Sequence, residues 1–316
     1  MTAAGRAVLT RRVRPMVVAI VACAAWLALG LAPAAAVAAP VTVGLFAPSA
    51  PFPSTGARVE LANRLGAALG KALGKPAAGR VYSRAADFAA AVKKGEVTIA
   101  LVDASYLASV VSGNTVIAVA LVADDQPSRA WRLVGRAGTP LGALKGKRLL
   151  VPSVGGRETD FVVNVLLGGD VGRDYFEKIE PAPDTASALA ALGLGKADGA
   201  VVPAAGDLPA GTAELLALPA LPNPVLVAYG VQLTADDRQA VLEAATAFKG
   251  DATIAGFRAA DADAVRGLAR RFYTASKQGP FAVPAARPAV TELAQGRTFA
   301  IERTPAATFA IAPALK

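Results

Sequence analysis

Short apolar runs alternate with helical patterns along this chain, and this alternation restricts the fold more than any other feature. Runs such as 41–48 and 97–102 read as buried strands, whereas Ala57–Leu73 and Ala85–Lys94 space their apolar residues as helices do. Strands that alternate with helices indicate an α/β sheet, with ligands bound at the carboxyl ends of its strands. The pattern therefore predicts an α/β fold.

The first 38 residues read as an export signal. Arginines precede the apolar run Met16–Ala32, and small residues with A-x-A spacing follow it. This is the pattern of a secretory signal peptide, here with cleavage after Ala38, and it predicts a periplasmic protein. The stretch Met16–Ala39 is also long enough to span a bilayer, so an uncleaved membrane anchor is the alternative.

The chain after the leader is long enough for two lobes. Roughly 280 residues exceed the commonest size of a single core. A second series of strands and helices begins at 130–136, and crossovers at 122–130 and 219–228 would join the two series. The predicted boundaries are 39–125 with 224–278 for lobe 1, 126–223 for lobe 2, and 279–316 for an extended tail rich in Pro, Ala and Thr.

Composition excludes most catalytic and metal chemistry. The chain has no histidine, and its one cysteine, Cys23, lies in the leader. His-assisted triads and zinc sites built on His or Cys are therefore excluded, and the acids show neither EF-hand spacing nor clustering. The net charge of +9 falls to about +5 without the leader's arginines, a mild excess. We expect no enzyme, no catalytic residue, no metal, no cofactor and no nucleic-acid partner.

Several phrases carry a family resemblance. "LKGKRLLVPSVGGRETDFVVNVLL" (144–167) and "TASALAALGLGKADGAVV" (185–202) look like the second lobe of exported type II solute-binding proteins. "ADFAAAVKKGEVTIALVDASYLA" (86–108) is similar to the helix, Gly turn, strand and Tyr loop of the branch that binds phosphate, phosphite and phosphonate. "PALPNPVLVAYGVQLTADDRQAVLEAA" (219–245) resembles that branch's return crossover.

The resemblance covers roughly residues 41–275 and has definite implications. It implies a two-lobed fold of the type II periplasmic-binding-protein kind, in which each lobe is a mixed sheet flanked by helices and two hinge crossovers join the lobes. It also implies a small anionic or zwitterionic ligand and, as partner, the membrane permease of an ABC importer. We expect a monomer.

The Gly-Gly-Arg turn is the candidate anion site of lobe 2. A strand that ends at Pro152 and a helix that begins near Glu158 would leave backbone N–H groups pointing into the cleft, where they attract anions. Arg157 would add a charged donor, whereas Glu158 would repel an anion unless it points outward. Alternatively, the turn only reverses the chain and both charges lie in water. The candidate residues are Ser153, Gly155, Gly156, Arg157 and Thr159.

Two loops supply the candidates of lobe 1. "APSAPFPSTG" (47–56) and "DASY" (103–106) each follow a strand, so their polar side chains would face the same cleft. Helix capping is the alternative role for most of them. An ionised Asp103 would favour a zwitterionic ligand with an amine. The candidate residues are Ser54, Thr55, Asp103, Ser105 and Tyr106.

These observations lead to a functional hypothesis. The protein would be an exported solute-binding protein that captures a small polar anion, such as a phosphonate-like or phosphate-like oxyanion, for an ABC importer. Where the family's phosphonate binders carry a run of hydroxyl residues, this chain keeps only Ser153, which motivates a sensory or scaffolding module as the alternative. If Arg157 is exposed and binds the anion, its loss should weaken binding and leave the stability of the free protein nearly unchanged.

Overall fold

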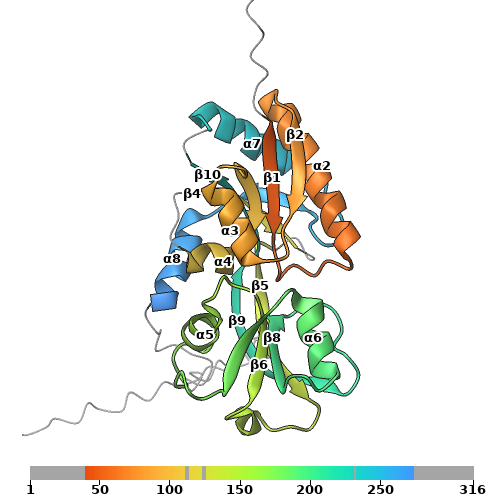
Figure 1. Ribbon diagram of the computed structural model, residues 1–316, viewed down its shortest axis with the longest axis vertical. Coiled ribbons are helices and arrows are strands. Elements are labelled where there is room, and N and C mark those ends of the chain that lie inside the picture. The colour runs from red at the N-terminus through yellow and green to blue at the C-terminus, as the bar shows by residue number, and fades with distance from the viewer. Residues whose placement is uncertain (1–39, 111–113, 123–125, 231–232, 274–316) are drawn as a thin grey trace, which may run out of the picture.

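The structure, a computed structural model, describes residues 40–110, 114–122, 126–230 and 233–273. Two lobes lie one above the other in Figure 1, and two crossovers of the chain connect them. The expected signal peptide at 1–38 and the expected tail at 279–316 lie outside the described residues.

Lobe 1 is built on a six-stranded mixed sheet with the order β11-β4-β10-β3-β1-β2. The strands β2, β1 and β3 are parallel to one another. β10 runs antiparallel to β3, β4 runs antiparallel to β10, and β11 runs antiparallel to β4. Its strands are β1 (Val41–Phe46), β2 (Ala77–Val81), β3 (Ile99–Val102), β4 (Asn114–Leu121), β10 (Val225–Tyr229) and β11 (Gly256–Ala259).

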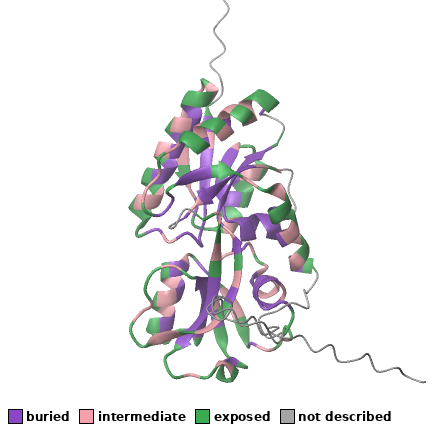
Figure 2. Cartoon of the chain, turned by 180° about the vertical axis from the view of Figure 1, so that it is seen from behind, coloured by how far each residue is buried: buried purple, intermediate pink, exposed green. Residues whose placement is uncertain are grey.

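Helices cover both faces of this sheet. Residues such as Leu65 of α2 and Val241 of α7 form an apolar core on one face, and Phe88 of α3 and Phe272 of α8 belong to the core on the other. Figure 2 shows buried strands inside each lobe and exposed residues along the outer sides of the helices. The helices are α2 (Thr55–Leu73), α3 (Ala85–Lys93), α4 (Ala104–Ser109), α7 (Ala235–Ala247) and α8 (Ala262–Tyr273).

Local sequence signals explain where these helices begin and end. The Ser54 side chain accepts a hydrogen bond from the backbone of Ala57 at the start of α2, and Gly74 ends this helix with a φ of +62°. Thr234 and Asp237 form a capping box at the start of α7. α2 lies so close to β2 that a Cβ atom on Gly79 would lie 2.2 Å from the Ala62 backbone.

Lobe 2 is built on a five-stranded mixed sheet with the order β7-β6-β8-β5-β9. The strands β7, β6 and β8 are parallel, and β5 runs antiparallel to both β8 and β9. Its elements are β5 (Ser128–Arg136), the 3-10 turn η1 (Leu141–Leu144), β6 (Arg148–Pro152), α5 (Glu158–Asp160), the π-helix η2 (Phe161–Leu166), β7 (Lys178–Ala182), α6 (Thr185–Gly193), β8 (Gly199–Pro203) and β9 (Thr212–Pro222).

The expected fold of two mixed sheets, flanking helices and two crossovers is confirmed, with local differences. The sequence pattern predicts neither β9 nor β11, and both lie at the edge of a sheet. An edge strand pairs on one side only, so β9 tolerates Pro219 and Pro222. The helix expected at Thr159–Leu167 is one α-helical turn followed by η2.

The two lobes also share packing beyond the crossovers. The first crossover links β4 to β5, and the second links β9 to β10. Buried Asn223 links the two crossovers, because its side-chain amide donates hydrogen bonds to the carbonyls of Ala120 and Gln126. The last helix, α8, follows β11 of lobe 1 and places Phe272 on Phe161 of η2 in lobe 2, with ring centroids 5.9 Å apart.

Candidate functional site

Two loops of lobe 1 meet at a buried carboxylate. Asp103 follows β3, and Ser49 lies in the loop after β1, the strand next to β3. Ser49 donates its backbone N–H to Oδ2 of Asp103 and its hydroxyl to Oδ1, both at 2.7 Å. Burial raises the pKa of Asp103 to about 6, although these hydrogen bonds and the charges of Arg129 and Arg58 oppose the rise. The carboxylate thus joins two loops, and it makes no capping bond to α4.

Lobe 2 contacts this pair of loops directly. Arg129 of β5 donates to the Ser49 carbonyl at 3.1 Å, and the Thr185 hydroxyl donates to the same oxygen at 3.2 Å. Arg58 of α2 pairs with Asp184, which caps α6, at 2.7 Å. These contacts hold the lobes together where the carboxyl ends of their strands face each other. We call Ser49, Arg58, Asp103, Arg129, Asp184 and Thr185 the interlobe junction.

The junction contains donors that the described residues leave unused. Nε and one terminal nitrogen of Arg129, together with Nε of Arg58, are buried and have no hydrogen-bond partner in the described part of the chain. Burial lowers the pKa of Arg129 to about 10, with the nearby Asp103 carboxylate acting in the opposite direction, so the guanidinium remains charged at neutral pH. An anionic group placed beside Arg129 would satisfy these donors.

The free space at the junction is small in this conformation. A gap of about 10 Å³ lies beside Arg58, Tyr82 and Pro183, which is roughly the space that one water molecule needs. A solute larger than water would therefore enter only if the lobes moved apart.

The Gly-Gly-Arg turn departs from its predicted role because its own glutamate occupies it. Gly155 and Gly156 adopt positive φ angles of +86° and +94°, as expected for this turn. Glu158 is buried, and its Oε1 accepts from the backbone N–H groups of Val154 at 3.1 Å and Gly156 at 3.2 Å. The Ser153 hydroxyl contacts the same oxygen at 3.5 Å. The amides that were expected to be open for an anion thus already bind a carboxylate.

Arg157 also lies elsewhere than expected. It pairs with Asp160 at 2.9 Å and donates to the backbone carbonyl of Phe272 at 3.1 Å. Its guanidinium lies over the Phe272 and Tyr273 rings, 5.1 and 4.2 Å from their centroids. With only 23% of its side chain exposed, Arg157 packs on α8, so the premise that it is exposed is wrong. We now expect its loss to lower the stability of the free protein.

The other predicted residues divide into caps and buried groups. Ser54 caps α2, and Thr55 is exposed beside it. Ser105 is buried and Thr159 is partly buried. Tyr106 packs with Phe46 and Phe88, and burial raises its pKa to about 12.

One contact across the lobes involves a residue that the sequence does not single out. The Ser109 hydroxyl at the end of α4 donates to the backbone carbonyl of Val154 in the turn of lobe 2. Beside it, the ring edge of Tyr106 lies about 3.0 Å from the position that a Cβ atom on Gly155 would take. The predicted loops 103–106 and 153–157 are therefore brought together, but by packing and a direct hydrogen bond.

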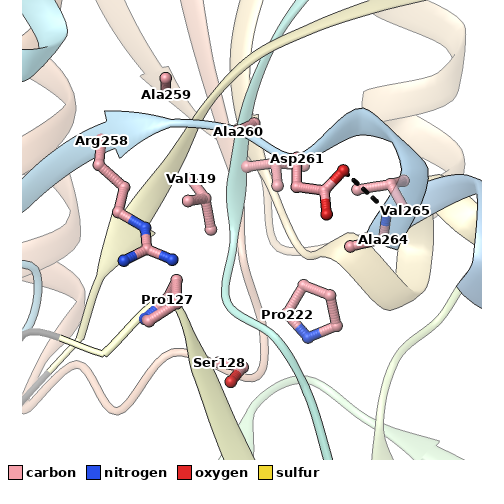
Figure 3. Close-up of a pocket in the computed structure, with 11 residues that line it drawn as sticks. Val119, Pro127, Ser128, Pro222, Arg258, Ala259, Ala260, Asp261, Ala264 and Val265 are labelled. Carbon is pink, nitrogen blue, oxygen red and sulfur yellow. Dashed lines mark hydrogen bonds between the residues drawn. The ribbon is translucent and has the colours of Figure 1, made fainter.

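A cavity of about 250 Å³ lies at the hinge itself (Figure 3). Pro127 and Ser128 of the first crossover and Pro222 of the second lie on its rim. Figure 3 shows the Arg258 guanidinium on one side and Asp261 on the other, where Asp261 accepts from the backbone of α8. Because both crossovers line this cavity, its shape would change whenever the lobes rotate.

Neither a membrane-spanning helix nor a metal-binding cluster is found in the described ranges. No helix there is long and apolar enough to cross a membrane. The same residues contain no group of three or more acidic, His or Cys side chains that could hold a metal ion.

Solved structures share this architecture. XAC2383 from Xanthomonas citri, bound to ATP, aligns with a TM-score of 0.55 at 10% identity, over 74% of this chain and 97% of that chain. The binding-protein component of an ABC phosphonate transporter from Pseudomonas aeruginosa aligns with a TM-score of 0.55 at 13% identity, over 81% and 92%. PhnD1 from Prochlorococcus marinus, in complex with methylphosphonate, aligns with a TM-score of 0.56 at 11% identity, over 73% and 96%.

The fold is that of type II periplasmic binding proteins. No protein-family model matches the sequence, and a search of curated proteins finds no match. The likeness at these identities concerns the fold, so the ligand has to be argued from the residues of this chain.

Removing the internal carboxylate should expose the amide site of the turn. We expect Glu158→Ala to lower the free energy of unfolding by about 1–3 kcal/mol, because the buried N–H of Val154 and the N–H of Gly156 lose their acceptor. Methylphosphonate should then raise the melting temperature of the variant by binding to the vacated amides. Glu158→Gln, which keeps an acceptor oxygen, is the matched control and should show no such gain. An equal response of wild type and both variants to methylphosphonate would contradict this assignment.

Proposed function

We propose that this protein is an exported solute-binding protein that captures a small polar anion between its lobes and delivers it to the permease of an ABC importer. One observation carries the proposal: Arg129, half-buried between the lobes, has two buried guanidinium nitrogens without a partner in the described part of the chain. The fold, and the phosphonate-transport role named for one protein that shares it, support this proposal. On this view the protein acts as a monomer in the periplasm.

The charges of the junction favour an oxyanion. Arg129 and Arg58 present fixed guanidinium donors, which bind phosphonate, phosphate or sulfonate oxygens through paired hydrogen bonds. Asp103 is held by both donors of Ser49, so a ligand amine would have to compete with two short hydrogen bonds. A phosphonate-like or phosphate-like oxyanion is therefore our first candidate, and a zwitterion is the second.

Capture would follow from exchange of partners at the junction. In this conformation the Ser49 carbonyl accepts from Arg129 and Thr185 of the other lobe. When the lobes separate, these donors become available to a solute. A solute that contacts both lobes then favours the closed state by its differential affinity for it.

The test measures the affinity for candidate solutes and the change in the protein's radius of gyration when a solute binds. Calorimetric titration with methylphosphonate, phosphate, methanesulfonate, acetate and glycine should identify a ligand, and solution scattering should show a changed radius of gyration on saturation. Arg129→Gln should weaken the binding of that ligand by about tenfold or more. Arg148→Gln is the control, because Arg148 lies at the start of β6 and its bonds to other described residues stay within lobe 2.

A binding-protein-like sensory or scaffolding module is the second candidate. It is favoured by the junction's own pairing, since Arg58–Asp184 and the bonds to Ser49 already join the lobes without a solute. If none of the five probes binds and the scattering profile never changes, this second candidate is supported and solute transport is not.

A further inference from the structure

A groove of about 440 Å³ lies on lobe 1, away from the interlobe junction. The end of α4, the start of β4 and one side of α8 line it, and α4 and α8 lie side by side in Figure 1. Leu107 of α4 and Val265 of α8 are buried in its lining, whereas Tyr273 at the end of α8 is 64% exposed. The groove therefore has an apolar interior and an aromatic ring on its wall.

The lining of this groove favours an apolar occupant over an ion. Val110, Val116 and Ala269 line it and are only partly buried. Its charged residue, Arg266, is already paired with Asp263 of its own helix. A continuous apolar surface of this kind marks a contact with another segment or molecule.

The same groove presents the edge of a strand. β11 pairs with β4 from Ala118 to Leu121, and β10 pairs with the other side of β4 from Asn114 to Val119. Within the described ranges, no strand lies beside Thr115 and Val116 on the side of β11. An extended segment added at this edge would point alternate side chains into the groove.

The chain continues from the wall of this groove. The described residues end at Tyr273, and residues 274–316 follow. Three short phrases there place alanine between a phenylalanine and a β-branched residue: FAV at 281–283, and FAI at 299–301 and 309–311. Residues two positions apart lie on the same side of an extended segment, so each phrase presents two large apolar side chains together. This pattern suits an apolar groove beside a strand edge.

The first of these phrases has the shortest connection to the groove. Phe281 is eight positions after Tyr273, and eight extended residues span about 26–29 Å. α8 has 12 residues and is about 18 Å long, so the chain can turn back and reach any point along it. Gly279 and Pro280, directly before the phrase, are residues typical of such a turn. The short connection also gives this phrase a higher effective concentration at the groove than the two later ones.

We propose that residues 281–283 bind in this groove as a strand added to the open edge of β4, with Phe281 and Val283 on its apolar lining. Pro284 follows and has no N–H to donate, so the added strand ends there. The occupant is a segment of this chain because the groove lies at the residue from which that segment continues. Since α8 also contacts lobe 2, the bound segment would hold this helix in place. The contact is independent of any solute at the interlobe junction.

Engineered cysteines test this contact, because Cys23 is the only cysteine of the chain and is replaced by serine throughout. Ala269→Cys combined with Val283→Cys pairs a groove position with the segment. Arg270→Cys combined with Val283→Cys is the matched control, because Arg270 is the next residue of α8 but is exposed and outside the groove. With a short thiol-specific cross-linker, the first pair should react at least about tenfold faster within one chain.

The two later phrases supply further controls. Ala269→Cys combined with Ile301→Cys or with Ile311→Cys should react as slowly as the Arg270→Cys pair. Phe281→Ser removes an aromatic ring from the groove, so the melting temperature should fall by about 3–6 °C. Phe299→Ser should leave the melting temperature unchanged.

Four results would overturn the proposal. Equal cross-linking at positions 269 and 270 would show that the segment does not lie in the groove. Faster cross-linking with position 301 or 311 would assign the groove to a later phrase. Cross-links that join two chains would identify a second copy as the occupant. An unchanged melting temperature in Phe281→Ser would show that the groove gains nothing from this segment and is open to another molecule.

Discussion

Replacing Phe161 by alanine is expected to lower the free energy of unfolding by about 3–5 kcal/mol and to loosen the contact between the lobes. Phe161 is fully buried, with Trp131 of β5 at 5.1 Å and Phe272 of α8 at 5.9 Å between ring centroids. Truncation leaves a cavity and removes the stacking partner that holds the end of α8 on lobe 2. Chemical denaturation measures the stability, and solution scattering of the free protein should show a larger radius of gyration.

Phe88→Ala is the matched control for this prediction. Phe88 is also fully buried, but it contacts Phe46, Tyr106 and Tyr229, all within lobe 1. The control should lose a similar amount of stability without a change in the radius of gyration before unfolding. If both variants expand equally, the expansion reflects general loosening of the cores, and α8 does not connect the lobes as we infer.

The contacts of α8 bear on how the lobes can move. Arg157 and Asn164 of lobe 2 both donate to the backbone carbonyl of Phe272. A rotation that opens the interlobe junction must therefore either break these bonds or turn about them. Rotation about these bonds requires less free energy than breaking them, because it keeps the stacked rings and both hydrogen bonds. We infer that the crossovers and the end of α8 together form the axis of the movement.

The fold could be predicted from the sequence because its signals are local. Buried runs such as 97–102 and the helical spacing of Ala57–Leu73 give strand and helix without knowledge of their neighbours. The missed strands are edge strands, whose weaker pattern depends on the neighbour with which they pair. β9 lacks the alternating burial of an ordinary strand, since its exposed residues Glu214, Ala217 and Ala220 are three positions apart, and it contains two prolines. Its pairing with β5 defines it as a strand.

The site was less predictable because its contacts are distant in sequence. The loops after β1 and β3 are expected to meet because these strands are neighbours, and Ser49 bonds to Asp103 there. Ser49 and Thr185, however, are 136 positions apart, and Arg129 and Ser49 are 80 apart. The sequence also does not show in which direction a side chain points. Glu158 points inward and accepts from backbone N–H groups of its own turn, whereas Arg157 points toward α8. The sequence is equally compatible with Glu158 in solvent and Arg157 at the turn.

Asp103 is expected to make the stability of this protein depend on pH in an unusual direction. Its pKa is about 6 in the folded state and near the ordinary value of 3.8 when unfolded. Between these values the folded state binds more protons than the unfolded state, so the free energy of unfolding falls as pH rises from about 4 to 6. The difference corresponds to about 3 kcal/mol, all of it retained below pH 4 and lost above pH 6.

Two variants separate this effect from the other carboxylates. Asp103→Asn cannot titrate, so denaturation midpoints measured from pH 4 to 7 should lack the decline seen in the wild type. Asp184→Asn tests a carboxylate whose pKa is shifted in the opposite direction. Burial alone would raise the pKa of Asp184, but hydrogen bonds from Ser187 and Arg58 hold it below its ordinary value. Asp184 therefore contributes stability that is present above about pH 4 and lost in acid, and its variant should keep the decline between pH 4 and 6. A wild-type profile parallel to that of Asp103→Asn would show that the Asp103 carboxylate is ionised throughout this range, and that the charge of Arg129 outweighs burial at the junction.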